Sequence, residues 1–266
     1  KSITTEYNSD WQKYYLKNLS AYLQLIINGL SENNNDECES NYVLFESILS
    51  NLRKKKSTIK EQEMLFQIPE NWFWAKLSDI CEISTGKKDV NEGHSEGIYP
   101  FFTCAQEPLR SNTYSFDDDC ILLPGNGANV GYVNRYKGKF ELYQRTYCLN
   151  KINESISVDF LELYLRGFWK NNLGQQFGSG INYLRISNFT NFIIPIPPTE
   201  MQTKILSFMK DLENNRLKVE GYYFNSEIEN KIISYHKSQI DGAEFSNQIN
   251  YQLDLIKQLR QAFLRE

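Results

Sequence analysis

The chain has 266 residues, 41% of them hydrophobic and 14% aromatic, which is enough to bury a core in one large domain or one domain with appendages. A formal net charge of -4 gives no global sign of nucleic-acid binding, so any DNA contact must come from a local basic cluster. No apolar run approaches the roughly 18 residues of a membrane span, and no signal-peptide segment opens the chain. The 5 cysteines lack a CxxC pair, which favours reduced thiols in a cytoplasmic compartment over a disulfide framework or a metal site.

Residues 1–66 are predicted to form an N-terminal helical region. Five apolar side chains recur at steps of four, three, four and four residues, which places them on one helix face: Tyr15, Leu19, Tyr22, Ile26 and Leu30. Turn-forming residues interrupt the pattern at 31–40, and a second helix is expected over 42–52. The basic segment that follows, RKKKSTIKEQE, is interpreted as a solvated helix end or linker.

Residues 67–198 are predicted to form a mixed α/β domain of a size usual for one domain. Short runs rich in β-branched and aromatic residues predict strands at CILLP (120–124), VGYVNRY (130–136), KFELYQRTYCL (139–149) and FIIPIP (192–197). One helix is expected over WAKLSDICEI (74–83). A second is expected after Ser157, whose hydroxyl suits an N-cap.

Residues 199–266 are predicted to form long helices. Thr199 is expected to cap the first of them, with Gln202 completing a capping box. Two apolar seams have heptad-like spacing: Met201, Ile205, Phe208, Leu212, Asn215 and Val219, then Phe245, Ile249, Gln252, Ile256, Leu259 and Phe263. Because each seam carries one polar member, as register-fixing coiled coils do, we expect an antiparallel coiled coil. The alternative is an ordinary helical subdomain packed on the α/β part.

The glycine-rich stretch LLPGNGANVGYVNRY (122–136) raises the possibility of a phosphate-binding loop. Such a loop must lead into a helix N-terminus, whose backbone N–H groups hold the phosphates. Here the GxGxxxG spacing fits neither common phosphate loop, and the following residues predict a β-hairpin with a turn at Lys137-Gly138. The glycines are therefore assigned to tight strand connections rather than to nucleotide binding.

Basic side chains concentrate in the same segment. Residues 133–151 contain 5 Lys and Arg against 1 acid, whereas residues 72–198 contain 12 against 13. Tyrosines alternate with these cations, and Asn, Gln and Arg side chains that could bind base edges lie beside them. Composition alone leaves two readings open, a DNA-facing loop set or a hairpin with a solvated basic face.

Four stretches, in order, resemble the specificity subunit of type I restriction-modification systems: IPENWFWAKLSDICEISTGK (68–87), DDDCILLPGNGANVGYV (117–133), GQQFGSGINYLRISNFTNFIIPIPPTEMQTKI (174–205) and LIKQLRQAFLRE (255–266). The resemblance implies a target recognition domain joined to helical spacers, with no chemistry of its own. Such subunits typically carry two recognition domains, whereas this chain has one. We therefore expect either a half-length subunit that forms a self-dimer or, given the ending LRE within a helical pattern, a fragment.

The resemblance also implies partners. Expected are double-stranded DNA, methyltransferase subunits that carry S-adenosylmethionine, and a restriction or translocase subunit that joins through the complex. No membrane, cofactor or metal is expected for this chain itself. The side chains expected to contact DNA, chosen by loop position and side-chain type, are Lys87, Lys88, Asn126, Asn134, Arg135, Lys137, Lys139, Gln144, Arg145, Asn182, Tyr183 and Arg185.

Two other functions are alternatives to this one. A stand-alone enzyme would need a catalytic constellation, but Asp117, Asp118 and Asp119 are adjacent in what reads as a solvated loop. There is no GxSxG, HExxH or suggestive Cys-His pair, and Cys104, Cys120 and Cys148 are interpreted as small core residues. The other alternative is an assembly or decoy module that binds the methyltransferase without reading DNA.

Overall fold

The computed structural model describes residues 15–32, 59–69, 71–177, 182–213, 231, 233–235 and 238. The chain divides into two compact units, one of residues 34–206 and one of residues 1–33 with 207–266. The predicted helix over 42–52 and the seam from Phe245 to Phe263 lie outside the described residues, as do Asn215 and Val219. The predicted division into regions 1–66, 67–198 and 199–266 stays a prediction.

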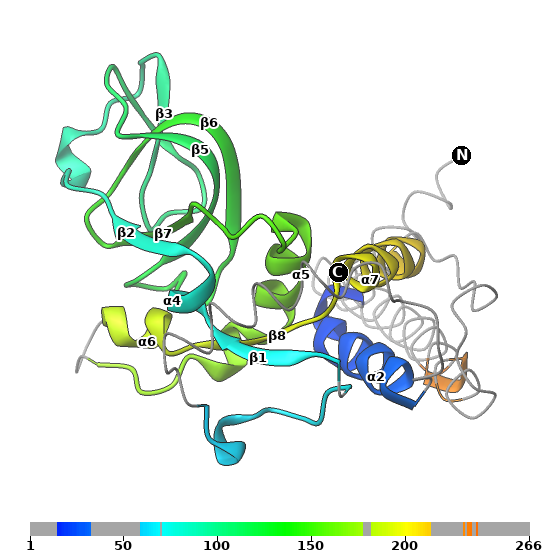
Figure 1. The fold of residues 1–266 in the computed structure, drawn as a ribbon. Coiled ribbons are helices and arrows are strands. Elements are labelled where there is room, and N and C mark those ends of the chain that lie inside the picture. Colours follow the sequence, from blue (N-terminus) through cyan, green and yellow to red (C-terminus); the bar gives the residue numbers. More distant parts are fainter. Residues whose placement is uncertain are drawn as a thin grey trace, which may run out of the picture. The chain divides into compact units, whose positions relative to one another are not determined.

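The α/β unit contains short strands and helices that follow one another closely (Figure 1). In chain order they are η1 (Glu61–Glu63), β1 (Phe73–Lys76), α4 (Leu77–Ile80), β2 (Glu82–Thr85), η2 (Val90–Glu92), β3 (Tyr99–Phe102), β4 (Leu109–Ser111), β5 (Phe116–Pro124), β6 (Asn134–Leu142), β7 (Thr146–Asn150), α5 (Val158–Phe168), η3 (Lys170–Asn172), α6 (Ile186–Thr190) and β8 (Ile193–Ile196). Helix α7 (Thr199–Glu213) begins in this unit and ends in the other.

The larger sheet has six strands in the order β2-β7-β5-β6-β3-β4. All neighbours are antiparallel except β3 and β6, which run parallel. The long strands β5 and β6 curve strongly in Figure 1. Alternate side chains of this sheet pack into one buried cluster, which comprises Cys120, Leu122, Phe140, Leu142 and Cys148. Burial of this cluster holds the curved sheet together.

A second core lies around helix α5. Ser157 accepts a hydrogen bond from the Phe160 amide at 3.3 Å, so the predicted N-cap is confirmed. The buried face of α5 leads to Trp169, which packs against Phe189 of α6 and Phe192 just before β8. Strand β8 pairs with β1, which joins residues 193–196 to residues 73–76. The predicted strand at FIIPIP is therefore confirmed, as are the mixed α/β class and the strand at CILLP.

The predicted helix over 74–83 is wrong. Trp74 and Ala75 belong to strand β1, a single helical turn spans Leu77–Ile80, and Ile83 lies in β2. Ala75 pairs with Ile194, so long-range strand pairing replaces the local helical preference.

The predicted hairpin with a Lys137-Gly138 turn is also wrong. Strand β6 runs through both residues, and Gly138 lies opposite Asp118 of β5. The turn falls at residues 143–145, where the Thr146 amide donates to the Tyr143 carbonyl at 3.0 Å. Residues 130–133, expected in a strand, lie outside it: residues 130 and 131 belong to a turn, and β6 begins only at Asn134. Opposite charges and the stacked Phe116–Phe140 pair, with centroids 5.1 Å apart, stabilise the longer β5–β6 ladder.

The predicted capping box at the start of α7 does not form. The helix already includes Thr199, and the Gln202 amide N–H bonds to the Pro198 carbonyl. The buried Gln202 side chain instead bonds to backbone groups before α5 and after β8. Its Oε1 accepts from the Ser157 N–H at 2.7 Å, and its Nε2 donates to the Ser155 and Pro197 carbonyls. Satisfying three backbone groups that are buried or partly buried outweighs the local cap.

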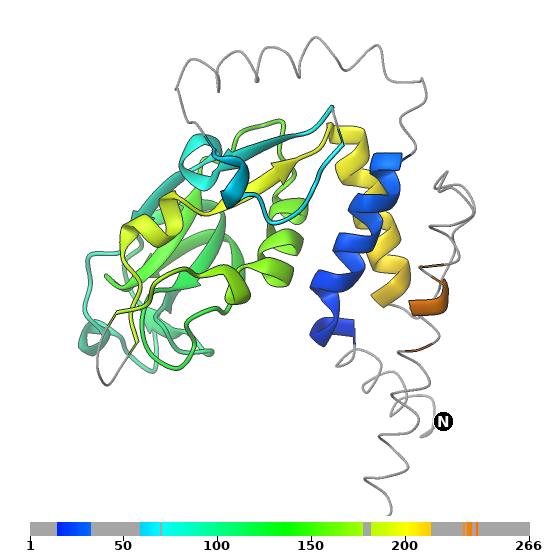
Figure 2. The ribbon, with the colours of Figure 1, turned by 90° about the horizontal axis from the view of Figure 1, so that it is seen from below.

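The helical unit contains α2 (Leu19–Glu32) beside the last turns of α7 (Figure 2). Four residues of the predicted face are buried: Tyr15, Leu19, Tyr22 and Ile26. The Tyr15 hydroxyl donates to the Met209 carbonyl of α7 at 3.1 Å. Phe208 of the first predicted seam is buried. The side chains of Leu212 in that seam and of Leu30 in the N-terminal face lie outside the part of the chain that the structure describes. None of the described helices is long and apolar enough to cross a membrane.

Candidate nucleic-acid interface

Four loops of the α/β unit form one continuous polar strip, which we call the loop edge: residues 87–89, 125–127, 144–145 and 182–185. Backbone hydrogen bonds join them in the spatial order 87–89, 144–145, 125–127 and 182–185. The Gln144 amide donates to the Lys88 carbonyl at 3.0 Å, and the Gly125 amide donates to the Arg145 carbonyl at 2.9 Å. On the other side of residue 125, the Leu184 amide donates to the Gly125 carbonyl at 2.7 Å. Segments up to about a hundred residues apart in the chain are thereby held side by side.

Two glycines permit this close approach of backbones. A Cβ atom added at Gly125 would lie 2.6 Å from the Arg145 carbonyl oxygen. A Cβ added at Gly86, directly before the first loop, would lie 1.7 Å from the Leu142 carbonyl oxygen. These glycines therefore serve strand and loop contacts, and Gly125–Gly131 leads into strand β6 rather than a helix, as predicted.

Exposed cations and amides occupy the loop edge. Lys87, Gln144, Arg145, Asn182 and Arg185 are all exposed, whereas Asn126 and Tyr183 are partly buried and pair with each other through a β-bridge. No ion pair is formed by the Lys87, Arg145 or Arg185 side chains with any residue that the structure describes.

The guanidinium of Arg185 is held over an aromatic ring. It lies 3.9 Å from the centroid of Phe177, whose ring is also close to that of Tyr183. The Arg185 backbone N–H donates to the Asn188 Oδ1 at 2.9 Å, which fixes the start of α6. Stacking restrains the plane of the guanidinium while leaving its N–H groups available, an arrangement suited to planar acceptors.

Lys88 lies in the loop edge but its ammonium is used inside the domain. Its Nζ donates to Thr113 Oγ1 at 2.6 Å and lies 3.5 Å from Glu141 Oε2. The Glu141 side chain is 2% exposed and also accepts from the Ser115 hydroxyl at 2.7 Å. Because a buried carboxylate needs such partners, Lys88 anchors the loop rather than offering a free charge.

The basic side chains of strand β6 are opposed by acids. Lys137 lies across from Asp119 and Lys139 across from Asp117. Lys139 also lies 4.6 Å from the centre of the Tyr114 ring. Asn134 begins the strand, opposite Leu122. The β6 surface is therefore compensated in charge, and its members do not join the loop edge.

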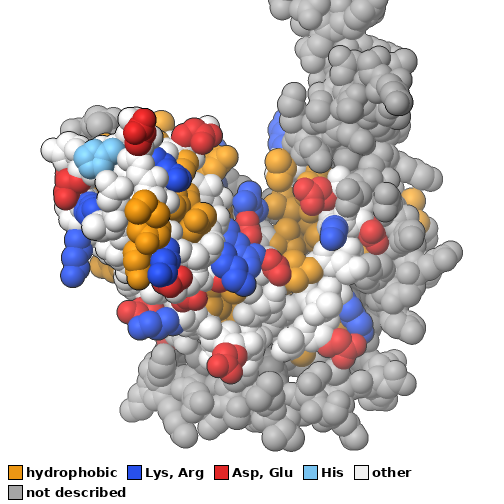
Figure 3. Space-filling model, turned by 90° about the horizontal axis from the view of Figure 1, so that it is seen from above, with side chains coloured by type: hydrophobic (Ala, Val, Ile, Leu, Met, Phe, Trp, Pro, Cys, Tyr) orange, Lys and Arg blue, Asp and Glu red, His pale blue; other side chains and the backbone are white. Residues whose placement is uncertain are grey.

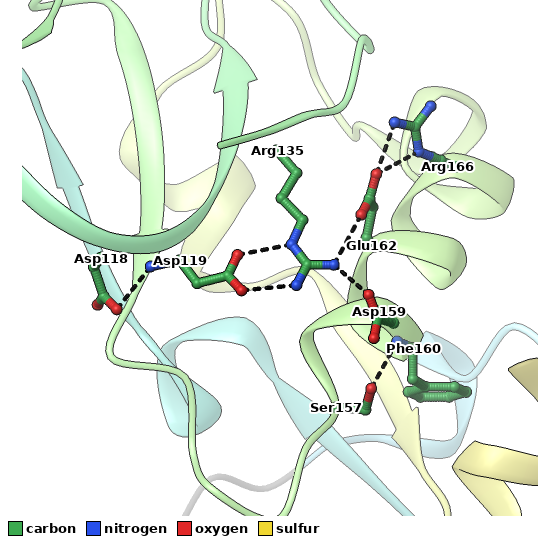
Figure 4. A network of polar contacts seen from close by, with 8 residues as sticks. All are labelled: Asp118, Asp119, Arg135, Ser157, Asp159, Phe160, Glu162 and Arg166. Carbon is green, nitrogen blue, oxygen red and sulfur yellow. Dashed lines mark hydrogen bonds and ion pairs between the residues drawn. The ribbon is translucent and has the colours of Figure 1, made fainter. Parts of the chain in front are cut away.

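Arg135 has an internal role, drawn in Figure 4. Its Nε and Nη2 donate to both carboxylate oxygens of Asp119 at 2.7 and 2.8 Å. Its Nη1 contacts Asp159 and, at 3.4 Å, Glu162, both on α5. The hydrogen bonds that Arg135 donates to Asp119 raise the pKa of Arg135 above its ordinary value. The guanidinium bridges β5, β6 and α5, so its donors are used within the domain.

The run Asp117–Asp119 was expected in a solvated loop and instead lies in strand β5. The hydrogen bonds from Arg135 lower the pKa of Asp119 below its ordinary value of 3.8. A lowered carboxyl pKa in the folded state stabilises the protein above the unfolded-state value, and that contribution is lost as the pH falls through the folded-state value.

We therefore expect a pH-dependent effect of Asp119→Asn. The substitution should lower the free energy of unfolding by about 1–2 kcal/mol at pH 7. The difference from the wild type should begin to shrink below about pH 4, where the carboxyl of the unfolded state becomes protonated, and should disappear as the pH falls through the lower folded-state pKa. Urea unfolding of both proteins at pH 7 and pH 3 measures this. A difference that is equal at the two pH values would show that the charge of Asp119 contributes nothing.

Three contributors to the site escape sequence reasoning. Lys170 of η3 lies beside the 127–131 loop, because a Cβ on Gly131 would lie 2.8 Å from its Cγ. Phe177 supports Arg185, and Asp89 accepts a hydrogen bond from Gln144. Asp89 could have been recognised as a helix cap, but its contact with a residue 55 positions away has no local signal.

Figure 3 shows both signs of charge among hydrophobic side chains on one face of the α/β unit.

The described cysteines are free thiols. Cys120 and Cys148 are buried in the sheet core, which confirms their interpretation as small core residues. Cys104 is only partly buried, with its Sγ 3.4 Å from the Arg145 carbonyl oxygen, so its assignment to the core is wrong. Burial raises the pKa of Cys81 to about 12.

Comparison with known proteins assigns the family. Residues 69–230 match the family described as type I restriction modification DNA specificity domain, which is more than half of the chain. The chain belongs to this family, as the sequence resemblance predicts.

Two curated relatives are specificity subunits of type I restriction enzymes. The EcoDI subunit of Escherichia coli is 34% identical over 158 residues, which cover 58% of this chain and 35% of that protein. The MjaVIII subunit of Methanocaldococcus jannaschii is 27% identical over 177 residues, which cover 60% and 40%. The chain thus spans well under half of the length of both relatives.

Solved structures of such subunits are similar at a lower level. The type I restriction-modification S subunit from M. genitalium has a TM-score of 0.44 and 14% identity, with 87% of this chain and 60% of that chain covered. The HsdS subunit from Thermoanaerobacter tengcongensis has a TM-score of 0.45 and 17% identity, with 77% and 51% covered. The family assignment therefore rests on the sequence matches.

Proposed function

We propose that the α/β unit recognises a specific sequence in duplex DNA through the loop edge. The observation that carries the proposal is the loop edge itself, where backbone hydrogen bonds hold four distant segments side by side. Three of these segments supply exposed cations and amides, and the fourth supplies the partly buried amide of Asn126. Membership of the DNA specificity domain family supports it. Phosphate contacts would position the protein and side-chain contacts with base edges would select the sequence.

The two kinds of contact are divided among the side chains of the edge. Lys87, Arg145 and the neighbouring Lys170 are exposed cations and are assigned to phosphates, which bind any sequence and release counterions. Arg185, restrained by Phe177, is assigned to base reading, because a fixed guanidinium matches the paired acceptors of guanine in the major groove. Asn126, Gln144 and Asn182 supply amides to the same strip.

The helices are proposed to connect this unit to its partners. An antiparallel coiled coil built on the seams of residues 201–219 and 245–263 would act as a rigid spacer. A helix of about 20 residues is roughly 30 Å long, close to one turn of duplex DNA. The same helices would bind methyltransferase subunits that carry S-adenosylmethionine and, through the complex, the restriction subunit, or would form a self-dimer.

Selection of bound fragments from random duplexes tests the proposal. We expect the full chain, mixed with its methyltransferase subunits, to enrich one sequence motif. Arg145→Ala should weaken binding about equally on all sequences and reduce the slope of log affinity against log salt concentration by about 1, because one phosphate contact is lost. Arg185→Ala should relax the preference at one base position.

Two outcomes would count against the proposal. A stable complex that enriches no motif would indicate an assembly module that does not read DNA. Unchanged affinity and salt dependence in both variants would place the contact surface elsewhere.

A further inference from the structure

Gln144 is the one exposed amide of the loop edge whose orientation is determined by a neighbouring carboxylate. Its Nε2 donates to Asp89 Oδ2 at 2.9 Å, and its backbone N–H donates to the Lys88 carbonyl at 3.0 Å. The turn that carries it is closed by the hydrogen bond from the Thr146 amide to the Tyr143 carbonyl. Both the backbone and the end of this side chain are therefore restrained.

Asp89 is itself held in place from the other side. Its Oδ1 accepts from the Asn91 N–H at 3.4 Å, and its own N–H donates to Glu92 Oε1 at 2.7 Å. These reciprocal bonds cap the short helix η2. The carboxylate that meets Gln144 is thus fixed before any ligand arrives.

The chemistry of the pair decides which atom of Gln144 is available. An ionised carboxylate can only accept hydrogen bonds, so the amide must turn its NH₂ group toward Asp89. The Oε1 atom has no hydrogen-bond partner among the described residues, and the side chain is exposed. What Gln144 presents is consequently an acceptor of fixed orientation.

We infer that Gln144 is a specificity-determining residue that accepts a hydrogen bond from the exocyclic amino group of an adenine or a cytosine. This inference rests on the proposed function of the loop edge. Adenine N6 and cytosine N4 are the amino donors of the major groove, whereas guanine O6 and thymine O4 are acceptors that would face Oε1 unfavourably. Asp89 excludes the other two bases because it prevents the amide from rotating its NH₂ group outward.

The inference predicts three results in the selection of bound fragments. The wild-type motif should contain one position restricted to adenine or cytosine by about tenfold or more. Gln144→Ala should reduce that preference to about equal use of the four bases while the rest of the motif stays the same. Asp89→Asn should admit guanine or thymine at the same position, because an asparagine amide can donate to Oε1 and let the Gln144 NH₂ group turn outward.

A matched control lies on the same short helix. Asn91 is exposed and contacts Asp89 through its backbone only, so Asn91→Ala should leave the whole motif as in the wild type. Thermal unfolding of each variant should coincide with that of the wild type, since Gln144 and Asp89 are exposed.

Synthetic duplexes then identify the amino group directly. If the selected position is adenine, it is replaced by a purine that lacks the 6-amino group. If it is cytosine, it is replaced by a pyrimidinone that lacks the 4-amino group. The wild type should lose about tenfold in affinity for that duplex, and Gln144→Ala should lose nothing further.

Failure of this inference can be distinguished from failure of the proposed function. Two results would overturn the role of Gln144 while DNA recognition stands. One is that Gln144→Ala leaves the motif intact. The other is that the preference lost in Gln144→Ala is a preference for guanine or thymine. Absence of any motif in the wild type would overturn both.

Discussion

Gly86→Ala is expected to lower the free energy of unfolding by about 3 kcal/mol and to weaken binding to the selected DNA. The added Cβ would lie 1.7 Å from the Leu142 carbonyl oxygen and 2.2 Å from its carbonyl carbon, so two backbone segments must separate. Gly86 directly precedes Lys87 and Lys88, so the displacement would reach the loop edge. Urea unfolding and DNA affinity of the purified variant measure the two effects.

Gly127→Asn provides the control, since it also replaces a loop glycine. A Cβ at Gly127 meets nothing within 4 Å, although its φ of +80° is one that most side chains avoid. Asparagine tolerates that conformation, so a loss below about 1 kcal/mol is expected. Equal losses in the two variants would show that the contact with Leu142 is unimportant.

Arg135→Met should lower the free energy of unfolding by about 2–3 kcal/mol, the second large effect. The substitution removes the paired hydrogen bonds to Asp119 and leaves three carboxylates close together without their common cation. The side chains of Arg135 and Asp119 are 24% and 21% exposed, so solvent compensates only in part. Chemical unfolding at pH 7 gives the value.

Arg166→Met tests the same cluster at its exposed rim. Arg166 bonds to Glu162 one helical turn away on α5 and is 44% exposed. Exposed pairs of this kind contribute about 0.5 kcal/mol or less, so the variant should be close to the wild type. If Arg166→Met proves as destabilising as Arg135→Met, the bridge between sheet and helix is not what stabilises the domain.

Elements with strong local signals are predictable from the sequence. Helix α5 has a capping serine and an apolar face of helical period, and strand β8 is a β-branched run stopped by prolines. The face of α2 follows from its steps of three and four residues. In each case one segment contains all of the determining information.

Pairings between distant segments are not predictable in this way. The segment around Trp74 reads as a helix until its partner strand, more than a hundred residues later, is taken into account. Lys137-Gly138 reads as a turn because the acids of β5 that oppose β6 are not local. Candidate site residues could be chosen by side-chain type and loop position. Side-chain type alone does not distinguish Arg135, whose guanidinium is paired with carboxylates, from Arg185, whose guanidinium is exposed and lies over the ring of Phe177.

The most direct test of the account compares two surfaces of the same unit. Affinity for the selected duplex and for a scrambled duplex should be measured for the double variant Arg145→Ala/Arg185→Ala on the loop edge and for Lys137→Ala/Lys139→Ala on strand β6. We expect the loop-edge variant to lose about a hundredfold in affinity for the selected duplex, together with most of its preference over the scrambled one. The β6 variant should stay within about threefold of the wild type, because its lysines are opposed by acids. The reverse pattern, with loss of recognition in the β6 variant alone, would contradict the assignment of DNA recognition to the loop edge.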